Sequence, residues 1–237
     1  MISVIITSEN ISENKIFIDE KSDVNHLKNV FRVKIGEEVR VVDGENEYIC
    51  QVEELGKKEI VLIIKECRKD MYSLNIQIDA AIGILKNDKM DLTIQKLTEI
   101  GINKVIPLMT KRGVVKLNEK KDKWDLIVRE ALKQCQGVRP MVIDEIKKIE
   151  KLSLEDYDLV IVPYECEDKY TLKNLISNQK KDIKKVLYII GPEGGFDIQE
   201  IEYLKSKGAN IVTLGKRILR AETASIVVGG VLINEFQ

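Results

Sequence analysis

The stretch YIIGPEGGFD, Tyr188 to Asp197, decides the fold of the C-terminal part of this chain. Its apolar half predicts a strand, which ends in a turn of three glycines, a proline and an acid. Glycine costs conformational freedom without adding packing, so core stability alone does not explain the turn. Pro192 has no amide hydrogen to donate, and Glu193 would repel an anion. The turn therefore predicts a site for a nucleotide-like ligand without phosphate; a tight strand-to-helix connection is the structural alternative.

The residues after the turn predict a helix. Asp197 stands three residues before Glu200, the spacing of a capping box, and Gly208 is a typical helix terminator. Around this unit, strand-like runs alternate with helical periodicity, which predicts an α/β domain with a parallel sheet. The expected strands are 76–85, 104–109, 158–163, 185–190 and 210–214, and the expected helices are 88–100, 124–135, 170–178 and 223–236.

The apolar residues of two expected helices indicate how these helices pack. The last one, TASIVVGGVLINEF, is apolar nearly all round, as a buried or interface helix would be. The helix over 124–135 is amphipathic, because six residues at helical spacing share one face: Trp124, Ile127, Val128, Ala131, Leu132 and Cys135.

The N-terminal part has a different pattern of predicted secondary structure. Short β-rich runs such as KIFID, EEVRVVDG, EYICQVEEL and EIVLIIKEC are separated by Gly, Asn and Asp turns, with one helical segment around 24–33. This pattern predicts a small β-barrel. The polar stretch RKDMYS, 68–73, lies where the β-rich pattern gives way to alternating strands and helices. We therefore expect two domains, 1–72 and 73–237.

The overall charge of the chain does not indicate a polyanionic partner. The 237 residues carry 38 basic and 39 acidic groups, a formal net charge of −1. The distribution is uneven, however, because residues 86–123 hold 10 basic and 5 acidic residues. This patch is a candidate footprint for a polyanion, and a solvated helix face is the alternative.

Several chemistries are poorly supported by the composition. The four cysteines are far apart and predict neither a zinc site nor disulfides; we expect buried thiols and no metal. His26 is the only histidine and falls in the N-terminal domain, which disfavours a histidine-based triad. The chain opens without a basic leader, and its most apolar run, 224–233, is too short to span a bilayer. We therefore expect a cytoplasmic protein without a membrane partner.

A second irregular loop follows the expected strand at 210–214. It reads LGKRILRAETA, 214–224, and carries Lys216, Arg217, Arg220 and Glu222 between two apolar segments. Ion pairs from Arg220 to Glu222 or from Arg217 to Glu193 are the structural alternative for these charges. Two loops at the ends of neighbouring parallel strands are where open α/β sheets bind ligands. No GxGxxG or GxxxxGK[ST] pattern occurs, which makes a Rossmann-type oxidoreductase remote.

The paired loops GPEGGF, 191–196, and LGKRILRAETA resemble those of the SPOUT methyltransferases, specifically the bacterial small-subunit (16S) ribosomal RNA uridine-N3 methyltransferases. The stretches 26–44 and 86–116 resemble further motifs of that family, so the resemblance covers nearly the whole chain. It departs where the chain opens MISVIITSE without an early arginine, and where KQCQGVRP, 133–140, differs in spacing.

The resemblance implies a fold, a cofactor and partners. The fold would be a C-terminal α/β domain with a deep trefoil knot, an exception to the rule against threaded loops, plus a PUA-like N-terminal barrel. The two loops would wrap S-adenosylmethionine, a sulfonium cation that carries no phosphate. The protein would be a homodimer through its apolar C-terminal helix, and its substrate would be ribosomal RNA within the small ribosomal subunit.

The resemblance also implies residue roles. Arg220 would stabilise charge that develops on a uracil carbonyl oxygen, and Glu222 would act as a base or orienter while N3 is methylated. RNA phosphates would meet Arg32, Arg40, Lys86, Lys89 and Arg112. The cofactor would be lined by Gly191, Pro192, Glu193, Gly194, Gly195, Leu214, Gly215, Arg217, Ile218, Leu219, Thr223 and Ala224.

Two other functions stay open at this point. One is a SPOUT RNA ribose 2′-O-methyltransferase, against which the PUA-like N-terminal half speaks. The other is a non-catalytic RNA-binding factor for ribosome assembly, which the intact GPEGG and RAETA loops disfavour.

Overall fold

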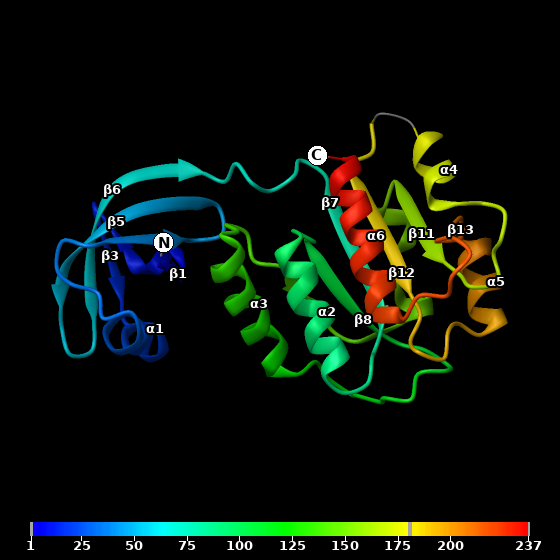
Figure 1. The fold of residues 1–237 in the computed structure, drawn as a ribbon, viewed down its shortest axis with the longest axis horizontal. Helices are drawn as coiled ribbons and strands as arrows, with labels where there is room; N and C mark the ends of the chain where they lie inside the picture. The colour runs from blue at the N-terminus through cyan, green and yellow to red at the C-terminus, as the bar shows by residue number, and fades with distance from the viewer. Residues whose placement is uncertain (1, 180–181, 237) are drawn as a thin grey trace. The chain divides into compact units, whose positions relative to one another are not determined.

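The structure is a computed structural model that describes residues 2–179 and 182–236. The chain forms two compact units (Figure 1). The first contains the residues up to Ser73 together with Arg129–Pro140, and the second contains Leu74–Val128 and the residues from Met141 on.

The first unit is built on a six-stranded sheet with the order β1-β4-β5-β6-β3-β2. Its centre is antiparallel, with β4 paired to β5 and β5 paired to β6, and β1 joins β4 in parallel. Closure of this sheet into a barrel stays a prediction. The elements are β1 Ser3–Ile5, β2 Ile11–Ser12, β3 Lys15–Ile18, α1 Lys21–Asn25 with a further helical turn at His26–Val30, β4 Glu38–Val42, β5 Asn46–Leu55 and β6 Ile60–Lys69.

The segment Arg129–Pro140 corrects the expected assignment of residues after 72 to the C-terminal domain. Helix α3, Asp122–Cys135, begins in the second unit, but its residues from Arg129 on belong to the first. Buried Asp23 accepts hydrogen bonds there from Arg129 and from Lys133 Nζ, the latter at 3.1 Å. A buried carboxylate needs such partners, and the segment supplies them.

The second unit is an α/β domain with a parallel seven-stranded sheet, ordered β10-β8-β7-β12-β11-β13, with β9 paired to β8. Its strands are β7 Gln77–Gly83, β8 Lys104–Met109, β9 Val142–Ile143, β10 Lys147–Lys148, β11 Leu159–Pro163, β12 Lys185–Ile190 and β13 Asn210–Val212. Its helices, besides the first part of α3, are α2 Asp88–Glu99, α4 Leu172–Ser177, α5 Ile198–Ser206 and α6 Ala221–Glu235.

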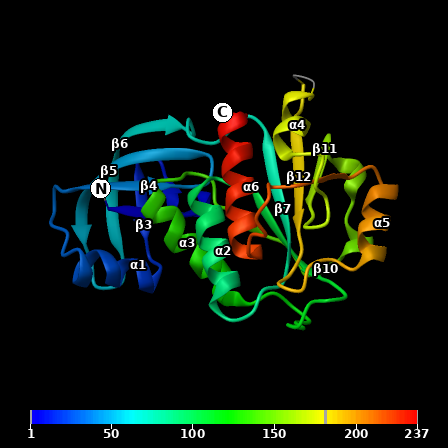
Figure 2. The same ribbon diagram turned by 45° about the vertical axis from the view of Figure 1, so that its right-hand side comes forward.

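The sheet is covered on both faces, which explains why its central strands are apolar without alternation. In β12, Val186, Tyr188 and Ile190 pack with α2 and α6, while Leu187 and Ile189 pack with α5. Helices α2 and α6 lie side by side (Figure 2), and α6 packs over β7 and β12. The predicted parallel α/β domain is confirmed.

Three expectations about composition can be compared with the structure. Cys50 is buried, but Cys67 and Cys166 are exposed and Cys135 is intermediate, so the prediction of four buried thiols is wrong. No helix in the described part of the chain is long and apolar enough to cross a membrane. Within residues 2–179 and 182–236, no group of three or more His, Cys, Asp or Glu side chains is arranged to hold a metal ion.

Candidate functional site

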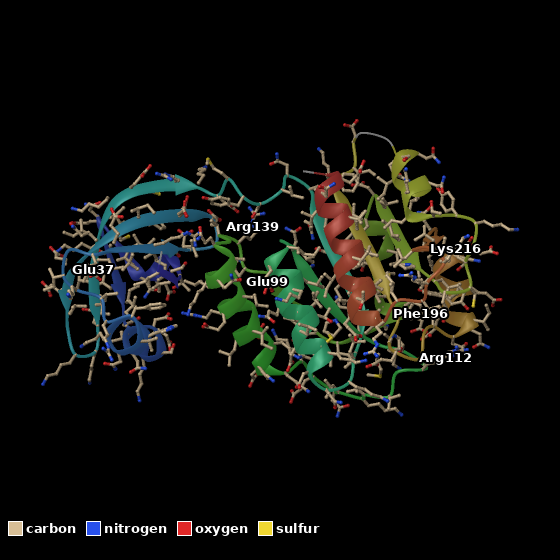
Figure 3. The ribbon with its side chains drawn as sticks, viewed as in Figure 1. Glu37, Glu99, Arg112, Arg139, Phe196 and Lys216 are labelled. Atoms are coloured by element: carbon tan, nitrogen blue, oxygen red, sulfur yellow. The ribbon has the colours of Figure 1, made fainter. Side chains whose placement is uncertain are left out.

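A pocket of about 560 Å³ opens at the carboxyl ends of β11, β12 and β13 in the second unit. Three loops that follow these neighbouring strands form most of its wall, which is the position where open α/β sheets bind ligands. Figure 3 shows Arg112, Phe196 and Lys216 on this side of the unit. The lining residues are Lys89, Pro163 to Glu165, Ile190 to Phe196, Thr213 to Ala221 and Ala224.

The GPEGG turn after β12 is held by close packing against protein atoms. The amide of Gly195 donates to Pro192 O at 2.9 Å, and Phe196 is buried below the turn. A Cβ on Gly191 would lie 3.2 Å from the Phe196 ring, and one on Gly194 would lie 3.0 Å from Arg112 O. Protein packing therefore explains these glycines.

The helix after the turn begins as the sequence predicts. Asp197 is the N-cap of α5, its carboxylate accepts from the Gln199 amide at 3.1 Å, and Glu200 Oε2 accepts from the Asp197 amide at 2.8 Å. Gly208, with φ of +86°, follows the C-cap. The capping box fixes the direction in which the chain leaves the turn.

The β13–α6 loop has free space and unpaired backbone groups where a ligand could bind. Gly215 has φ of +118°, and a Cβ built on it would meet no atom within 4 Å. Among the residues that the structure describes, the amides of 216–220 donate to no protein acceptor. Ile218 is 83% exposed, although a large apolar side chain gains by burial. The loop thus offers unpaired backbone groups and an uncovered apolar side chain.

Three charged side chains from different elements meet beside the pocket. Lys89 Nζ lies 3.7 Å from Glu193 Oε1 and 3.5 Å from Glu222 Oε1. Glu222 is 9% exposed, and its Oε2 is buried without a hydrogen-bond partner in the described structure. Burial works against ionisation of Glu193, but the Lys86 amide at 3.0 Å and the Lys89 charge outweigh it, so the pKa of that carboxyl is lowered. Lys89 therefore faces two carboxylates.

The structure places most of the predicted cofactor residues together. From Gly191 to Gly195 and from Leu214 to Leu219, every predicted position lines the pocket, and so do Arg220 and Ala224. Thr223 does not line it and is exposed, and Glu222 reaches it through Lys89. Helix α6 starts at Ala221, so Arg220 is its N-cap and Glu222 lies in its first turn. The ion pairs considered as an alternative, Arg220 to Glu222 and Arg217 to Glu193, do not form in the described chain.

Two of the predicted RNA contacts need correction. Arg40 is only 2% exposed, because Glu47 Oε1 at 2.5 Å and Ser3 Oγ at 3.0 Å hold its guanidinium inside the first unit. It is a structural residue. Lys89 lines the pocket and pairs with acids, which does not fit a phosphate contact. Arg32 and Lys86 are exposed, and Arg112 lies 3.6 Å from Asp197 with half of its side chain exposed.

Some pocket residues were not anticipated. Besides Lys89, they include Tyr164 and Glu165, which directly follow β11. The sequence did carry a signal, because YEC follows an apolar strand in the same way as GPEGG does.

The fold and the pocket belong to a known class of enzymes. A family model described as an RNA methyltransferase domain matches residues 72–233, and one described as an RNA methyltransferase PUA domain matches residues 18–65. The chain belongs to this RNA methyltransferase family, with its PUA domain at the N-terminus.

Individual proteins of this family are similar to the chain over nearly its whole length. Ribosomal RNA small subunit methyltransferase E of Bacillus subtilis is 30% identical over 234 residues, which cover 93% of this chain and 91% of the relative. The protein of the same name from Rickettsia conorii is 31% identical over 227 residues, 94% of this chain and 91% of the relative. A methyltransferase of Legionella pneumophila, solved in complex with the cofactor S-adenosylmethionine, superposes with a TM-score of 0.83 and 25% identity, covering 98% of this chain and 96% of that one.

Proposed function

We propose that this protein transfers a methyl group from S-adenosylmethionine to N3 of a specific uridine in small-subunit ribosomal RNA. The observation that carries the proposal is the pocket at the carboxyl ends of three parallel strands, because two of the three loops that form its wall resemble the family signature. The two relatives described above are named for the small-subunit ribosomal RNA, and the Legionella protein binds the cofactor.

The residues of the pocket fit the cofactor. Unpaired backbone groups of 216–220 can meet an adenine edge, and Gly215 leaves open space beside them. Glu193 and Glu222 share one lysine, so their carboxylates are suited to a positively charged sulfur nearby. Pro192 and Glu193 disfavour a phosphate. When bound, S-adenosylmethionine supplies a methyl group on a positively charged sulfur.

Residues of the protein bind the uracil and remove its N3 proton. N3 lies on the Watson–Crick edge, so the base must leave its stack to reach the pocket. N3 loses a proton when it is methylated. Glu222 acts as the base for this proton or as the group that orients Lys89: its Oε2 is buried without another partner, and its Oε1 lies 3.5 Å from Lys89 Nζ at the pocket wall. Arg220 has no ion-pair partner in the described chain and stabilises negative charge on a uracil oxygen.

The family resemblance extends the proposal to topology and assembly. The loops 191–196 and 214–220 would belong to a deep trefoil knot, and α6 would pair with a second copy in a homodimer. Val227 and Val231, one turn apart on α6, are 41% and 40% exposed, and a partner would bury them. A ribosomal RNA substrate implies a cytoplasmic protein.

The test is transfer of labelled methyl from S-adenosylmethionine to small ribosomal subunits that lack the modification, followed by nucleoside analysis. The expected product is 3-methyluridine. A 2′-O-methylated nucleoside would contradict the assignment of the reaction. No transfer to subunits or to free RNA would favour a non-catalytic assembly factor.

A further inference from the structure

A third loop enters the pocket between the two that resemble the family signature. Strand β11 lies between β12 and β13 in the sheet, so the residues after it emerge between the GPEGG turn and the β13–α6 loop. Pro163, Tyr164 and Glu165 all line the pocket, and Glu165 is their one ionisable acid. This position gives Glu165 access to a ligand that both other loops touch.

The backbone of the GPEGG turn lies directly against Glu165. A Cβ on Gly195 would collide with Glu165 Oε1 and would lie 3.6 Å from Oε2. Gly195 also has φ of +67°, which favours glycine. The turn therefore leaves room for this carboxylate at the pocket wall.

Glu165 is exposed and lines the pocket, and unlike Glu193 and Glu222 it has no protein partner in the described chain. Glu193 and Glu222 share Lys89. Glu167, two residues further on, accepts from the amides of Lys169 at 2.9 Å and Tyr170 at 3.0 Å. In the described chain no hydrogen bond or ion pair reaches Glu165, although cationic residues line the same pocket. An ionised carboxylate can only accept, so its natural partner is a group rich in hydrogen-bond donors.

We propose that Glu165 is a ligand-binding residue that accepts hydrogen bonds from the hydroxyl or ammonium groups of the cofactor. The inference rests on the proposed function, because S-adenosylmethionine carries both a ribose diol and an α-ammonium group. Either would give charge-assisted hydrogen bonds, which are stronger than neutral ones. Phosphate-bearing ligands would be repelled by the same carboxylate.

The test is calorimetric binding of two probes to the full chain and to Glu165→Gln, which keeps the size of the side chain. S-adenosylhomocysteine carries ribose and the amino acid, whereas 5′-methylthioadenosine carries ribose alone. We expect Glu165→Gln to bind S-adenosylhomocysteine about tenfold more weakly or worse, the loss typical of a hydrogen bond to a charged group. Asp168→Asn, an exposed acid of the same loop outside the pocket, is the matched control and should bind both probes normally.

The two probes identify the partner. An equal loss for both supports the ribose hydroxyls, and a loss confined to S-adenosylhomocysteine supports the ammonium group. Unchanged binding of both probes by a folded Glu165→Gln overturns the inference while the proposed function stands. If the unmodified protein binds neither probe, the proposed cofactor is wrong and the inference falls with it.

Discussion

The buried charged side chains of the first unit are fully partnered, whereas several charged side chains around the pocket of the second are not. In the first unit, Arg40 donates to Glu47, to Ser3 and to the carbonyls of Gln136 and Gly137 at 2.8 and 3.2 Å. Buried Asp23 is matched by Arg129 and Lys133. Around the pocket, by contrast, Glu165 and Arg220 have no ionic partner in the described chain, and Glu222 leaves one oxygen unpaired.

The difference separates structural charge from charge available for binding. A buried ion pair is retained only when its hydrogen bonds are complete, and completing them leaves nothing for a ligand. Unpaired charges that are exposed in an open pocket, such as Glu165 and Arg220, cost less, because water satisfies them until a ligand arrives. Residue type alone does not make this distinction: Arg40 and Arg220 are both arginines, and their burial and their partners set them apart.

The largest expected effect is on stability, from Arg40→Ala. Removing this guanidinium leaves Glu47 buried without its cation, which costs about 3–5 kcal/mol of unfolding free energy. Urea unfolding measures the change. Arg68→Ala is the control, because Arg68 pairs with Glu66 on the exposed part of the same sheet and its loss should leave the midpoint nearly unchanged. Equal stability of the two variants would remove the contrast between structural and available charge.

The next effect is on turnover, from Arg220→Ala. If Arg220 stabilises the charge that develops on uracil, its loss should slow methyl transfer by about 10²–10³-fold. Affinity for S-adenosylhomocysteine should stay within about tenfold, and stability should not change, because Arg220 is exposed and unpaired. Lys173→Ala, an exposed charge on α4, is the control. Full turnover of Arg220→Ala would show that this arginine is not part of the reaction.

Lys89→Gln separates a positioning role from a phosphate contact. Lys89 lies 3.5 Å from Glu222, so its loss should reduce turnover about tenfold without changing how RNA affinity depends on salt. A phosphate contact would instead lower the slope of log affinity against log salt by about 1. Single-turnover rates and a salt titration of RNA binding give both values. A lowered slope with normal turnover would restore Lys89 to the RNA-binding surface.

The smallest effect is expected from Arg32→Gln in the first unit. Arg32 is exposed, so RNA affinity should fall a few-fold and the salt slope should drop by about 1. S-adenosylhomocysteine binding and the unfolding midpoint should not change. An unaltered salt slope would mean that Arg32, like Arg40, does not contact phosphate.

Sequence reasoning succeeded where burial leaves a local pattern. The bounds of β8 and β12 agree with the expected strands 104–109 and 185–190, because both are uniformly apolar runs between polar ends. The capping box of α5 could also be predicted from the sequence, since it depends on two residues that are three positions apart. Short strands such as β1, β9 and β10 were missed, because two or three residues carry no periodicity.

Reasoning from the sequence failed where a residue's role depends on distant partners. The run EVRVV gives no sign that Arg40 faces inward to Glu47 and to a segment almost a hundred residues later. Lys89 belongs with the pocket only because α2, the GPEGG turn and α6 converge on it. The glycines of the turn predicted a pocket, but a Cβ on any of them would meet protein atoms, and Gly215 is the pocket-lining glycine beside open space.

The most direct test of the central claim is a crystal structure of the protein with S-adenosylhomocysteine. The ligand should lie between the GPEGG turn and the β13–α6 loop, with Glu165 and the amides of 216–220 as its partners, while Arg40 keeps its bonds to Glu47. A ligand bound elsewhere, or one that leaves Glu165 and the loop amides without contacts, would contradict the claim that unpaired groups in this pocket mark the cofactor site.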